Sequence, residues 1–426
     1  MNKREARPTV ALDSLGCKLN QAEMQQLARQ LTAAGYRLVE PTDKADIYIL
    51  NTCTVTHIAD RKSRHMLRMA RRRNPGARLV AIGCYAQRAP RELAQIEGVE
   101  LVIGNDRKMN LLKLLEDADN MVRPVTGDSM NKQQDGRTRA FVKVQDGCRN
   151  FCAYCIVPLV RSREENVPVE KVTALVRGLV ANGYQEVVLT GTEIGAYNGN
   201  GVNLEGLLKR ILAETAVPRL RLSSLQPHQI SPGLIGLWRD SRLCPHFHLS
   251  LQSGSDAVLK RMKRRYNIDD YRRVVSLIRD SVPDVAITTD VIVGFPGETD
   301  AEFQETLDFC RQMQFARIHV FPFSSRPGTE AADMPQQVPA GVRKQRSQEM
   351  RALAKESALS FRKRFLFRTM NVLWEKQSGG VWSGLTGNYI KVYARSDMDL
   401  TNRVLPVKLA KLYRDEVWGE ETSISL

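Results

Sequence analysis

Short apolar runs alternate with longer amphipathic segments along the first part of the chain. Residues 10–15, 47–50 and 79–82 are apolar enough to predict strands. Each is followed by a segment with helical spacing of its apolar residues, and these segments are 20–34, 57–72 and 89–96. Glycine, or an Asn-Pro-Gly turn, closes each helix. The pattern predicts an N-terminal α/β domain with an open parallel sheet over residues 8–119.

The same alternation then repeats about six times, over residues 134–362. The predicted strands are 141–145, 186–190, 219–223, 246–251, 285–293 and 317–323. Six strand-helix units predict a partial (β/α)6 barrel, short of the closed eight-stranded one. Its active site would lie at the carboxyl ends of the strands, with an open side for a large substrate. A polar stretch over 117–138 is predicted to link it to the first domain.

The last segment, residues 363–426, has five short predicted strands separated by turns. They are 370–375, 381–386, 390–393, 404–409 and 416–418. This density of short strands predicts a small OB-like β-barrel. Trp374, Trp382, Tyr389 and Tyr393 are aromatic enough to stack on bases, although most such side chains are core residues, so one or two at most are expected to do so.

The charge of the chain indicates the kind of partner that it binds. The chain has 63 Lys and Arg against 47 Asp and Glu, a net charge of +16, which predicts a polyanionic partner, with nucleic acid the first candidate. Two basic runs, 61–73 and 343–368, favour RNA, although either alone is typical of a solvated helix face. The polar first residues are unlike a signal peptide, and no apolar stretch has the length of a membrane span, so a cytoplasmic protein is expected.

Three cysteines, Cys148, Cys152 and Cys155, stand close together in a C-x3-C-x2-C spacing. Three thiolates on one loop can bind three irons of a 4Fe–4S cluster and leave the fourth iron open to a ligand. Zinc would need a fourth ligand, and the nearest candidates, His228 and Cys244, are distant in sequence. A disulfide framework is not expected, because eight cysteines in 426 residues are sparse.

Cys17, Cys53 and Cys84 each follow one of the three predicted strands of the first domain. Ligands of open parallel sheets bind outside the carboxyl ends of the strands, so these three thiols are expected to converge on a second cluster. The alternative is that all three are buried thiols acting as small hydrophobic residues. Cys244 and Cys310 stand alone and are predicted to be core thiols of this kind, and His228 is expected to be structural.

With its flanking residues, the Cys148 loop resembles that of the radical S-adenosylmethionine (SAM) superfamily, and the strand-end cysteines narrow the resemblance to the methylthiotransferases. The resemblance implies that the open iron chelates SAM and that an electron cleaves it to a 5′-deoxyadenosyl radical. It implies SAM contacts to the amino group by Gly191, Thr192 and Glu193, to the ribose by Ser250 and Gln252, and to adenine by the backbone of Ile292 and Gly294. It implies no catalytic side chain. One departure is the stretch 156–163, which is several residues shorter than is usual and puts substrate handling in doubt.

The strings Gly16-Cys17-Lys18-Leu19-Asn20 and Gly83-Cys84-Tyr85-Ala86-Gln87 resemble most the branch acting on N6-threonylcarbamoyladenosine. The resemblance implies methylthiolation of C2 of this nucleoside at tRNA position 37, with two 4Fe–4S clusters and a C-terminal TRAM RNA-binding domain. It implies the tRNA anticodon stem-loop and a flavodoxin-type or ferredoxin-type electron donor as partners, and it leaves the sulfur donor unknown. The alternatives are isopentenyladenosine, a ribosomal protein aspartate, or a non-enzymatic RNA-binding protein that contains a metal.

Overall fold

The computed structural model describes residues 8–118 and 138–421, so most of the predicted linker lies outside the described residues. The chain divides into two compact units. Of the described residues, the first contains 8–118 together with two short later segments, 146–165 and 324–332. The second contains residues 138–145, 166–323 and 333–421. The loop with Cys148, Cys152 and Cys155 therefore packs with the N-terminal sheet.

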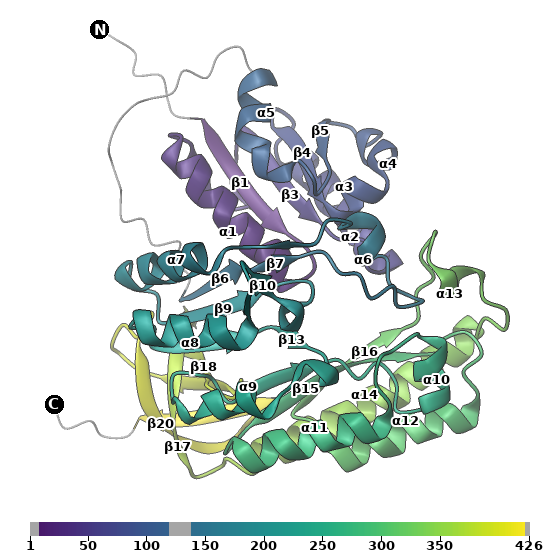
Figure 1. The fold of residues 1–426 in the computed structure, drawn as a ribbon. Coiled ribbons are helices and arrows are strands. Elements are labelled where there is room, and N and C mark those ends of the chain that lie inside the picture. The colour runs from purple at the N-terminus through teal and green to yellow at the C-terminus, as the bar shows by residue number, and fades with distance from the viewer. Residues whose placement is uncertain (1–7, 119–137, 422–426) are drawn as a thin grey trace, which may run out of the picture. The chain divides into compact units, whose positions relative to one another are not determined.

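The first unit is built on a five-stranded parallel sheet (Figure 1). The strand order is β2-β1-β3-β4-β5. The strands are β1 (Thr9–Ser14), β2 (Arg37–Val39), β3 (Ile47–Thr52), β4 (Arg78–Gly83) and β5 (Val99–Ile103). This confirms the predicted parallel sheet. Because the strand order reverses between β1 and β3, the carboxyl ends of these two strands border the crevice where such sheets bind ligands.

Helices cover both faces of this sheet. Ile47 and Ile49 of β3 point to one face, where they pack with α1 (Lys18–Ala33) and α5 (Leu111–Ala118). Tyr48 and Leu50 point to the other face, which α2 (His57–Arg73), α3 (Cys84–Arg88) and α4 (Pro90–Ala94) cover. A strand that is buried on both faces reads as a continuous apolar run. This explains why the pattern at residues 47–50 lacks the alternation of a half-exposed strand.

The second unit contains six parallel strands in chain order, as predicted. They are β6 (Arg139–Lys143), β9 (Glu186–Thr190), β12 (Arg219–Leu222), β14 (His246–Leu249), β15 (Ala286–Val293) and β16 (Arg317–Pro322). They form two sheets, β12-β9-β6 and β13-β14-β15-β16, with β13 at Ser224–Leu225, and Leu220 of β12 forms a bridge with Leu243, which lies in the segment just before β14. The arrangement is an open barrel with all its strand carboxyl ends at one edge.

The helices of this unit cover the outer face of the strands (Figure 1). The longer ones are α7 (Val169–Ala181), α8 (Leu204–Glu214), α11 (Ile268–Ser281), α12 (Asp300–Met313) and α14 (Ala340–Lys363). Phe247 and Leu249 of β14, and Ile287 and Val291 of β15, pack in the core that these helices share with the strands. Since strand side chains alternate, the even-numbered positions of β14 and β15 lie on the inner face.

The short elements connect these larger ones. In the first unit they are η1 (Lys108–Asn110) and α6 (Val157–Val160), and β7 (Gln145–Asp146) pairs with β8 (Glu165–Asn166) where the chain passes between the units. In the second unit they are η2 (Ile194–Ala196), β10 (Asn198–Gly199), β11 (Val202–Asn203), η3 (Pro227–Gln229), α9 (Pro232–Gly236), η4 (Leu237–Arg239) and α10 (Asp256–Arg261). Helix α13 (Glu330–Asp333) precedes α14.

The last five strands close into a small barrel in the order β17-β18-β19-β21-β20. They are β17 (Thr369–Ser378), β18 (Val381–Thr386), β19 (Lys391–Arg395), β20 (Val404–Tyr413) and β21 (Glu416–Glu421). All five predicted strands are present. Trp374 and Trp382 are only 1% and 4% exposed in the core of this barrel. The suggestion that these two side chains stack on bases is therefore wrong, because apolar packing takes up both rings.

This small barrel is attached to the amino ends of the six parallel strands. Glu186, the first residue of β9, forms ion pairs with Arg219 at 2.8 Å and Arg221 at 2.9 Å. These two arginines donate hydrogen bonds to the carbonyls of Leu385 and Thr386, at the end of β18, and of Gly387, in the turn after it. The small barrel therefore covers the amino ends of the six parallel strands and not their carboxyl ends.

Tyr389 belongs to the same attachment, since the guanidinium carbon of Arg221 lies 3.7 Å from its ring centroid. Its ring also packs edge-on against His246 at 4.5 Å. Tyr393 packs against Tyr413 with ring centroids 5.6 Å apart. Of the four aromatic side chains considered for base stacking, the three at positions 374, 382 and 389 thus have structural contacts that account for them.

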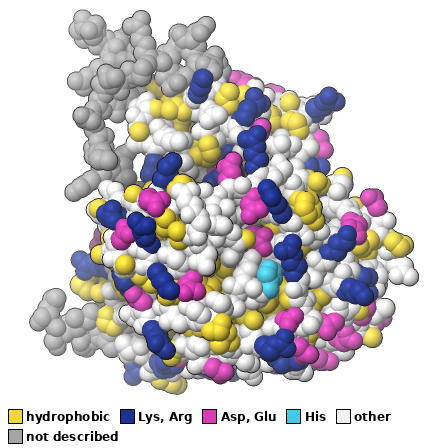
Figure 2. Space-filling model, viewed as in Figure 1, with side chains coloured by type: hydrophobic (Ala, Val, Ile, Leu, Met, Phe, Trp, Pro, Cys, Tyr) yellow, Lys and Arg dark blue, Asp and Glu magenta, His cyan; other side chains and the backbone are white. Residues whose placement is uncertain are grey.

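Basic and acidic side chains are interspersed on the face of the molecule drawn in Figure 2, so the positive charge is not gathered there into one patch. In the described ranges, no helix is both long enough and apolar enough to cross a membrane.

Candidate active site

Cys17, Cys53 and Cys84 lie together at the carboxyl edge of the first unit's sheet. Cys17 caps the start of α1, Cys53 directly follows β3, and Cys84 begins α3 after β4. Burial raises the pKa of the Cys53 thiol to about 12, and among the smaller influences the sulfurs of Cys17 and Cys84 raise it further. The buried Cys53 thiol stays protonated without a metal, and binding of a metal there would displace its proton.

Glycines give these cysteines their close approach. Gly16 has a φ of +106°, and a Cβ at this position would lie 2.8 Å from the Cys53 sulfur. Gly83 has a φ of +97°, and its Cβ would lie 2.1 Å from Asn51 Oδ1 and 2.9 Å from the Thr52 carbonyl. Any other residue would meet both backbone strain and a collision. The local sequence Gly-Cys is thus what lets the sulfurs approach one another.

Two hydrogen-bond donors point at the Cys84 sulfur. Arg161 Nε lies 3.3 Å from it and Asn105 Nδ2 lies 3.4 Å from it. Donors of this kind stabilise the negative charge that a cysteine sulfur carries when it binds iron. The three thiols, their placement at the crevice and these donors fit an iron–sulfur cluster whose sulfur ligands carry negative charge.

Arg161 is the centre of a buried ionic network. Its guanidinium pairs with Glu23 at 3.0 Å and with Asp146 at 2.7 Å, and it donates to Asn20 Oδ1 at 2.9 Å. Burial alone would lower the pKa of Arg161, but the negative groups at Cys84, Glu23 and Asp146 outweigh burial and raise it, so it stays cationic. The network ties the 146–165 segment to the sheet edge beside Cys84.

Arg161 and Asn105 were not among the residues singled out from the sequence. Arg161 is 138 positions from Glu23 in the chain, and no periodicity relates the two. A buried cation in a loop gives no pattern of its own. The only sequence signal was that this arginine lies six residues after Cys155.

The Cys148 loop is shaped by a turn and a glycine. The Cys155 amide donates to the Cys152 carbonyl at 2.9 Å, which closes a tight turn, and all three cysteines are half-buried. Gly147 has a φ of +76°, and a Cβ there would lie 2.1 Å from the Arg163 carbonyl. Three half-buried thiols on a single turn fit the ligand set of a cluster whose fourth iron stays accessible.

The residues implied in SAM binding lie at the carboxyl ends of the second unit's strands. Glu193 follows β9 and is buried, and its Oε1 accepts hydrogen bonds from Gln226 and Gln229, each at 2.8 Å. Gly191 precedes it, where a Cβ would lie 3.0 Å from the Gln145 carbonyl. Thr192 lies between these two residues. The arrangement presents an oriented carboxylate, which suits an ammonium group.

Ser250 and Gln252 follow β14 on adjacent inward positions. The Gln252 amide donates to the Asp290 carbonyl at 2.8 Å, and the Gln252 carbonyl accepts from the Ile292 amide at 2.8 Å. The Gly294 amide donates to Glu298 Oε2 at 2.6 Å. Because the amides of Ile292 and Gly294 both donate within the protein, backbone contacts from these two residues to an adenine would use their carbonyl oxygens.

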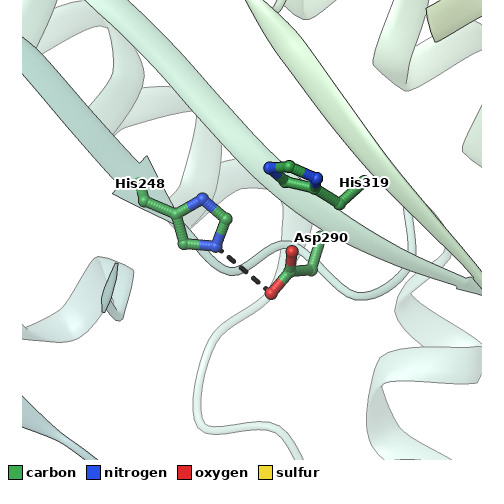
Figure 3. A group of neighbouring side chains, drawn as sticks. All are labelled: His248, Asp290 and His319. Carbon is green, nitrogen blue, oxygen red and sulfur yellow. Dashed lines mark ion pairs between the residues drawn. The ribbon is translucent and has the colours of Figure 1, made fainter. Parts of the chain in front are cut away.

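A further polar group on the inner face joins three adjacent strands. His248 of β14, Asp290 of β15 and His319 of β16 point toward one another (Figure 3). His248 Nε2 lies 3.2 Å from Asp290 Oδ2, and a ligand atom of each side chain lies within 4.8 Å of the others. None of the three was among the residues that the resemblance implies in cofactor binding.

These three residues are of the types that bind metals, but their ligand atoms are far apart, at up to 4.8 Å from one another. Ligands at the usual distances around zinc lie roughly 3.4 Å apart, so the three atoms would have to close in. In the structure the His248 imidazole is paired with the Asp290 carboxylate, and this pairing fixes the orientation of the imidazole. Asp290 is two positions before Ile292 on the same face, so the trio lies in the barrel just below the expected cofactor contacts.

Comparisons with known proteins agree with this organisation. Residues 142–310 match the model of the Radical SAM superfamily, and residues 9–104 match the model described as uncharacterized protein family UPF0004. A radical SAM methyltransferase, TsrM of Kitasatospora setae, has a similar fold, with a TM-score of 0.57 at 14% identity, and the match covers 77% of each chain.

Curated relatives match over almost the entire chain. The threonylcarbamoyladenosine tRNA methylthiotransferase MtaB of Thermotoga maritima is 39% identical, and the match covers 90% of each chain. The Bacillus subtilis protein of the same name is 35% identical over 95% of this chain and 94% of its own. The tRNA-2-methylthio-N(6)-dimethylallyladenosine synthase of Syntrophotalea carbinolica is 34% identical over 96% and 98%. On this similarity the chain belongs to the radical SAM methylthiotransferase family, enzymes that use SAM and iron–sulfur clusters.

Proposed function

We propose that this protein methylthiolates C2 of N6-threonylcarbamoyladenosine at position 37 of tRNA. The observation that carries the proposal is the convergence of Cys17, Cys53 and Cys84 beside the donors on Cys84. A radical SAM enzyme needs only the Cys148 loop to cleave its cofactor, and a second set of three thiols supplies the place for a sulfur-carrying cluster. The names of the relatives from Thermotoga maritima and Bacillus subtilis support the choice of nucleoside.

The proposed ligands are Cys148, Cys152 and Cys155 for one 4Fe–4S cluster, and Cys17, Cys53 and Cys84 for the other. When bound, the first cluster supplies the electron that cleaves SAM and the second carries the sulfur that is transferred. In the proposal Glu193 orients the ammonium group of SAM, Gly191 and Thr192 shape the turn around it, Ser250 and Gln252 bind the ribose, and Ile292 and Gly294 border the adenine. No protein general base is assigned.

The proposal also covers the organisation of the chain. Residues 8–119 would form the domain of the second cluster, 134–362 the radical SAM core, and 363–426 a TRAM domain that binds RNA. The partners would be the tRNA anticodon stem-loop and a flavodoxin-type or ferredoxin-type electron donor, and the protein would act in the cytoplasm. The positive net charge of +16 supports an RNA partner.

Iron analysis tests the two cluster sites. We expect the anaerobically reconstituted protein to hold about eight irons, and the variant with Cys17, Cys53 and Cys84 changed to Ala to hold about four. The variant at Cys148, Cys152 and Cys155 should lose the other four and should form no 5′-deoxyadenosine. Cys244→Ala is the matched control, because Cys244 is a buried thiol outside both groups and should keep all the iron. Full iron in the first variant, or zinc in place of iron, would contradict the two-cluster assignment.

Nucleoside analysis tests the substrate. Digested tRNA from cells that lack the gene should have lost 2-methylthio-N6-threonylcarbamoyladenosine and should regain it when the gene is restored. Loss of a methylthiolated isopentenyladenosine would instead favour the second candidate, which the Syntrophotalea carbinolica relative's name supports. An unchanged tRNA profile would leave a protein substrate, the remaining alternative within the same chemistry.

A further inference from the structure

A surface pocket of about 480 Å³ opens in the first unit, and none of the six cluster cysteines lines it. Four arginines line it, Arg61, Arg64, Arg88 and Arg326, together with the carboxylates of Asp60 and Glu92. Four guanidinium groups against two carboxylates leave an excess of two positive charges. Neither cluster site explains this excess, because none of the six cysteines lines the pocket.

The two carboxylates hold some of these arginines in place. Asp60 Oδ2 accepts from Arg88 at 3.2 Å and from Arg326 at 2.6 Å, while Asp60 Oδ1 accepts from Thr54. Glu92 lies 3.8 Å from Arg64 and 3.9 Å from Arg88. Over the described part of the chain Arg61 has no acidic partner. Ion pairs within the pocket therefore hold several of its arginines in place, and the Arg61 guanidinium stays available to an anionic ligand.

Arg326 lacks part of its hydrogen bonding. Its side chain is 1% exposed, and its Nη2 donates to Thr54 and Asp60. Its Nε and Nη1 have no acceptor among the described residues. A buried guanidinium with three unpaired N–H groups on two nitrogens is costly, so an oxygen-rich group at this wall of the pocket would reduce that cost.

The amino end of α2 faces the same pocket, which His57, Ile58 and Arg61 of its first turns line. Thr56 caps this 17-residue helix by accepting from the Ala59 amide at 3.1 Å. The partial positive charge at a helix amino end adds to that of the arginines. Tetrahedral oxyanions bind at such ends, and the guanidinium fork matches their geometry.

We propose that this pocket binds a backbone phosphate of the RNA substrate. The inference rests on the proposed tRNA substrate and names where the first unit holds it. A polyanion is favoured over a small free anion because Arg61 is exposed at the rim and is followed by further exposed cations on the same helix, Lys62, Arg68 and Arg72. A phosphate in the pocket would place the neighbouring nucleotides along this helix.

Salt-dependent binding of full-length, cluster-loaded protein to unmodified tRNA tests the proposal. Each phosphate contact adds about 0.7 to 0.9 to the slope of log K against log salt concentration. Arg61→Ala should reduce that slope by about one and weaken binding equally for different tRNAs. Arg107→Ala is the control, because it removes the same charge from an exposed position of the same unit outside the pocket and should leave the slope unchanged.

Competition with inorganic phosphate shows whether the pocket binds a backbone phosphate of tRNA or only a small free anion. In the proposal, millimolar phosphate competes with tRNA for the wild-type protein and not for Arg61→Ala. An unchanged slope for Arg61→Ala, equal losses for Arg61→Ala and Arg107→Ala, or phosphate binding that does not compete with tRNA would each overturn it. A wild-type protein that fails to bind tRNA at any salt concentration would instead overturn the proposed substrate, which keeps the two failures distinct.

Discussion

Glu186 carries the attachment between the small barrel and the six-stranded sheet. It is fully buried, and its carboxylate is the counter-ion of Arg219 and Arg221, which hold the turn after β18. Removing one partner of a buried ion pair costs about 3–5 kcal/mol, because the remaining charge stays in a poorly solvated place. Glu186→Gln should therefore lower the melting temperature by about 10 °C. Asp308→Asn, which removes an exposed partner of Arg311, should leave it unchanged.

The Glu186 carboxylate also predicts that the stability of the fold decreases in acid. Burial would raise the pKa of Glu186, but Arg221 and Arg219 outweigh burial and lower it to about 2 from the ordinary 4.5. A group with a lowered folded pKa contributes stability that is fully present above its unfolded pKa. That contribution should be lost as the pH falls from about 4.5 toward 2. Melting curves in this range should converge for wild type and Glu186→Gln, and a constant difference would contradict the assignment.

Gly83 sets the position of Cys84. Replacement by Ala would place a Cβ 2.1 Å from Asn51 Oδ1 and 2.9 Å from the Thr52 carbonyl, at a φ of +97°. With a ψ of −155°, this backbone conformation is open essentially to glycine alone and costs another residue about 1–3 kcal/mol. We expect Gly83→Ala to lower the melting temperature and to lose iron from the second cluster. Gly76→Ala is the control, because the nearest atom to its Cβ is 3.8 Å away. Iron retained at the wild-type level would show that Cys84 does not need this turn.

At the level of elements, β15 separates two roles on its two faces. Asp290 lies on the inner face with His248 and His319, whereas Val291 is buried against the outer helices. Asp290→Ala should reduce methylthio transfer by at least about tenfold, because it removes the partner that orients His248, while the melting temperature stays close to wild type. Val291→Ala should cost about 2 kcal/mol of stability with the activity retained. Opposite results for the two variants would mean that the faces are wrongly assigned.

The elements could be predicted because their signals are local. The predicted strands 10–15, 47–50 and 79–82 end within two residues of the observed strand ends Ser14, Thr52 and Gly83, so the sequence alone located the cysteines after them at one sheet edge. Arg161 and Arg326 could not be located in this way. Each is a cation in an irregular segment, and their partners Glu23 and Asp60 are far away in the chain. The burial of Trp374 and Trp382 agrees with the expectation that most of the aromatic side chains in this segment are core residues.

The whole molecule carries a net charge of +16, and this predicts how the proposed tRNA should bind. Cations that neutralise phosphates release counterions, so affinity falls steeply with salt. With about six phosphate contacts, the affinity should fall about a thousandfold between 50 and 200 mM salt. Fluorescence anisotropy with labelled anticodon stem-loop measures this directly. Affinity that does not change with salt would mean that bases, not phosphates, dominate the contact, and the basic run on α2 would then have no part in binding.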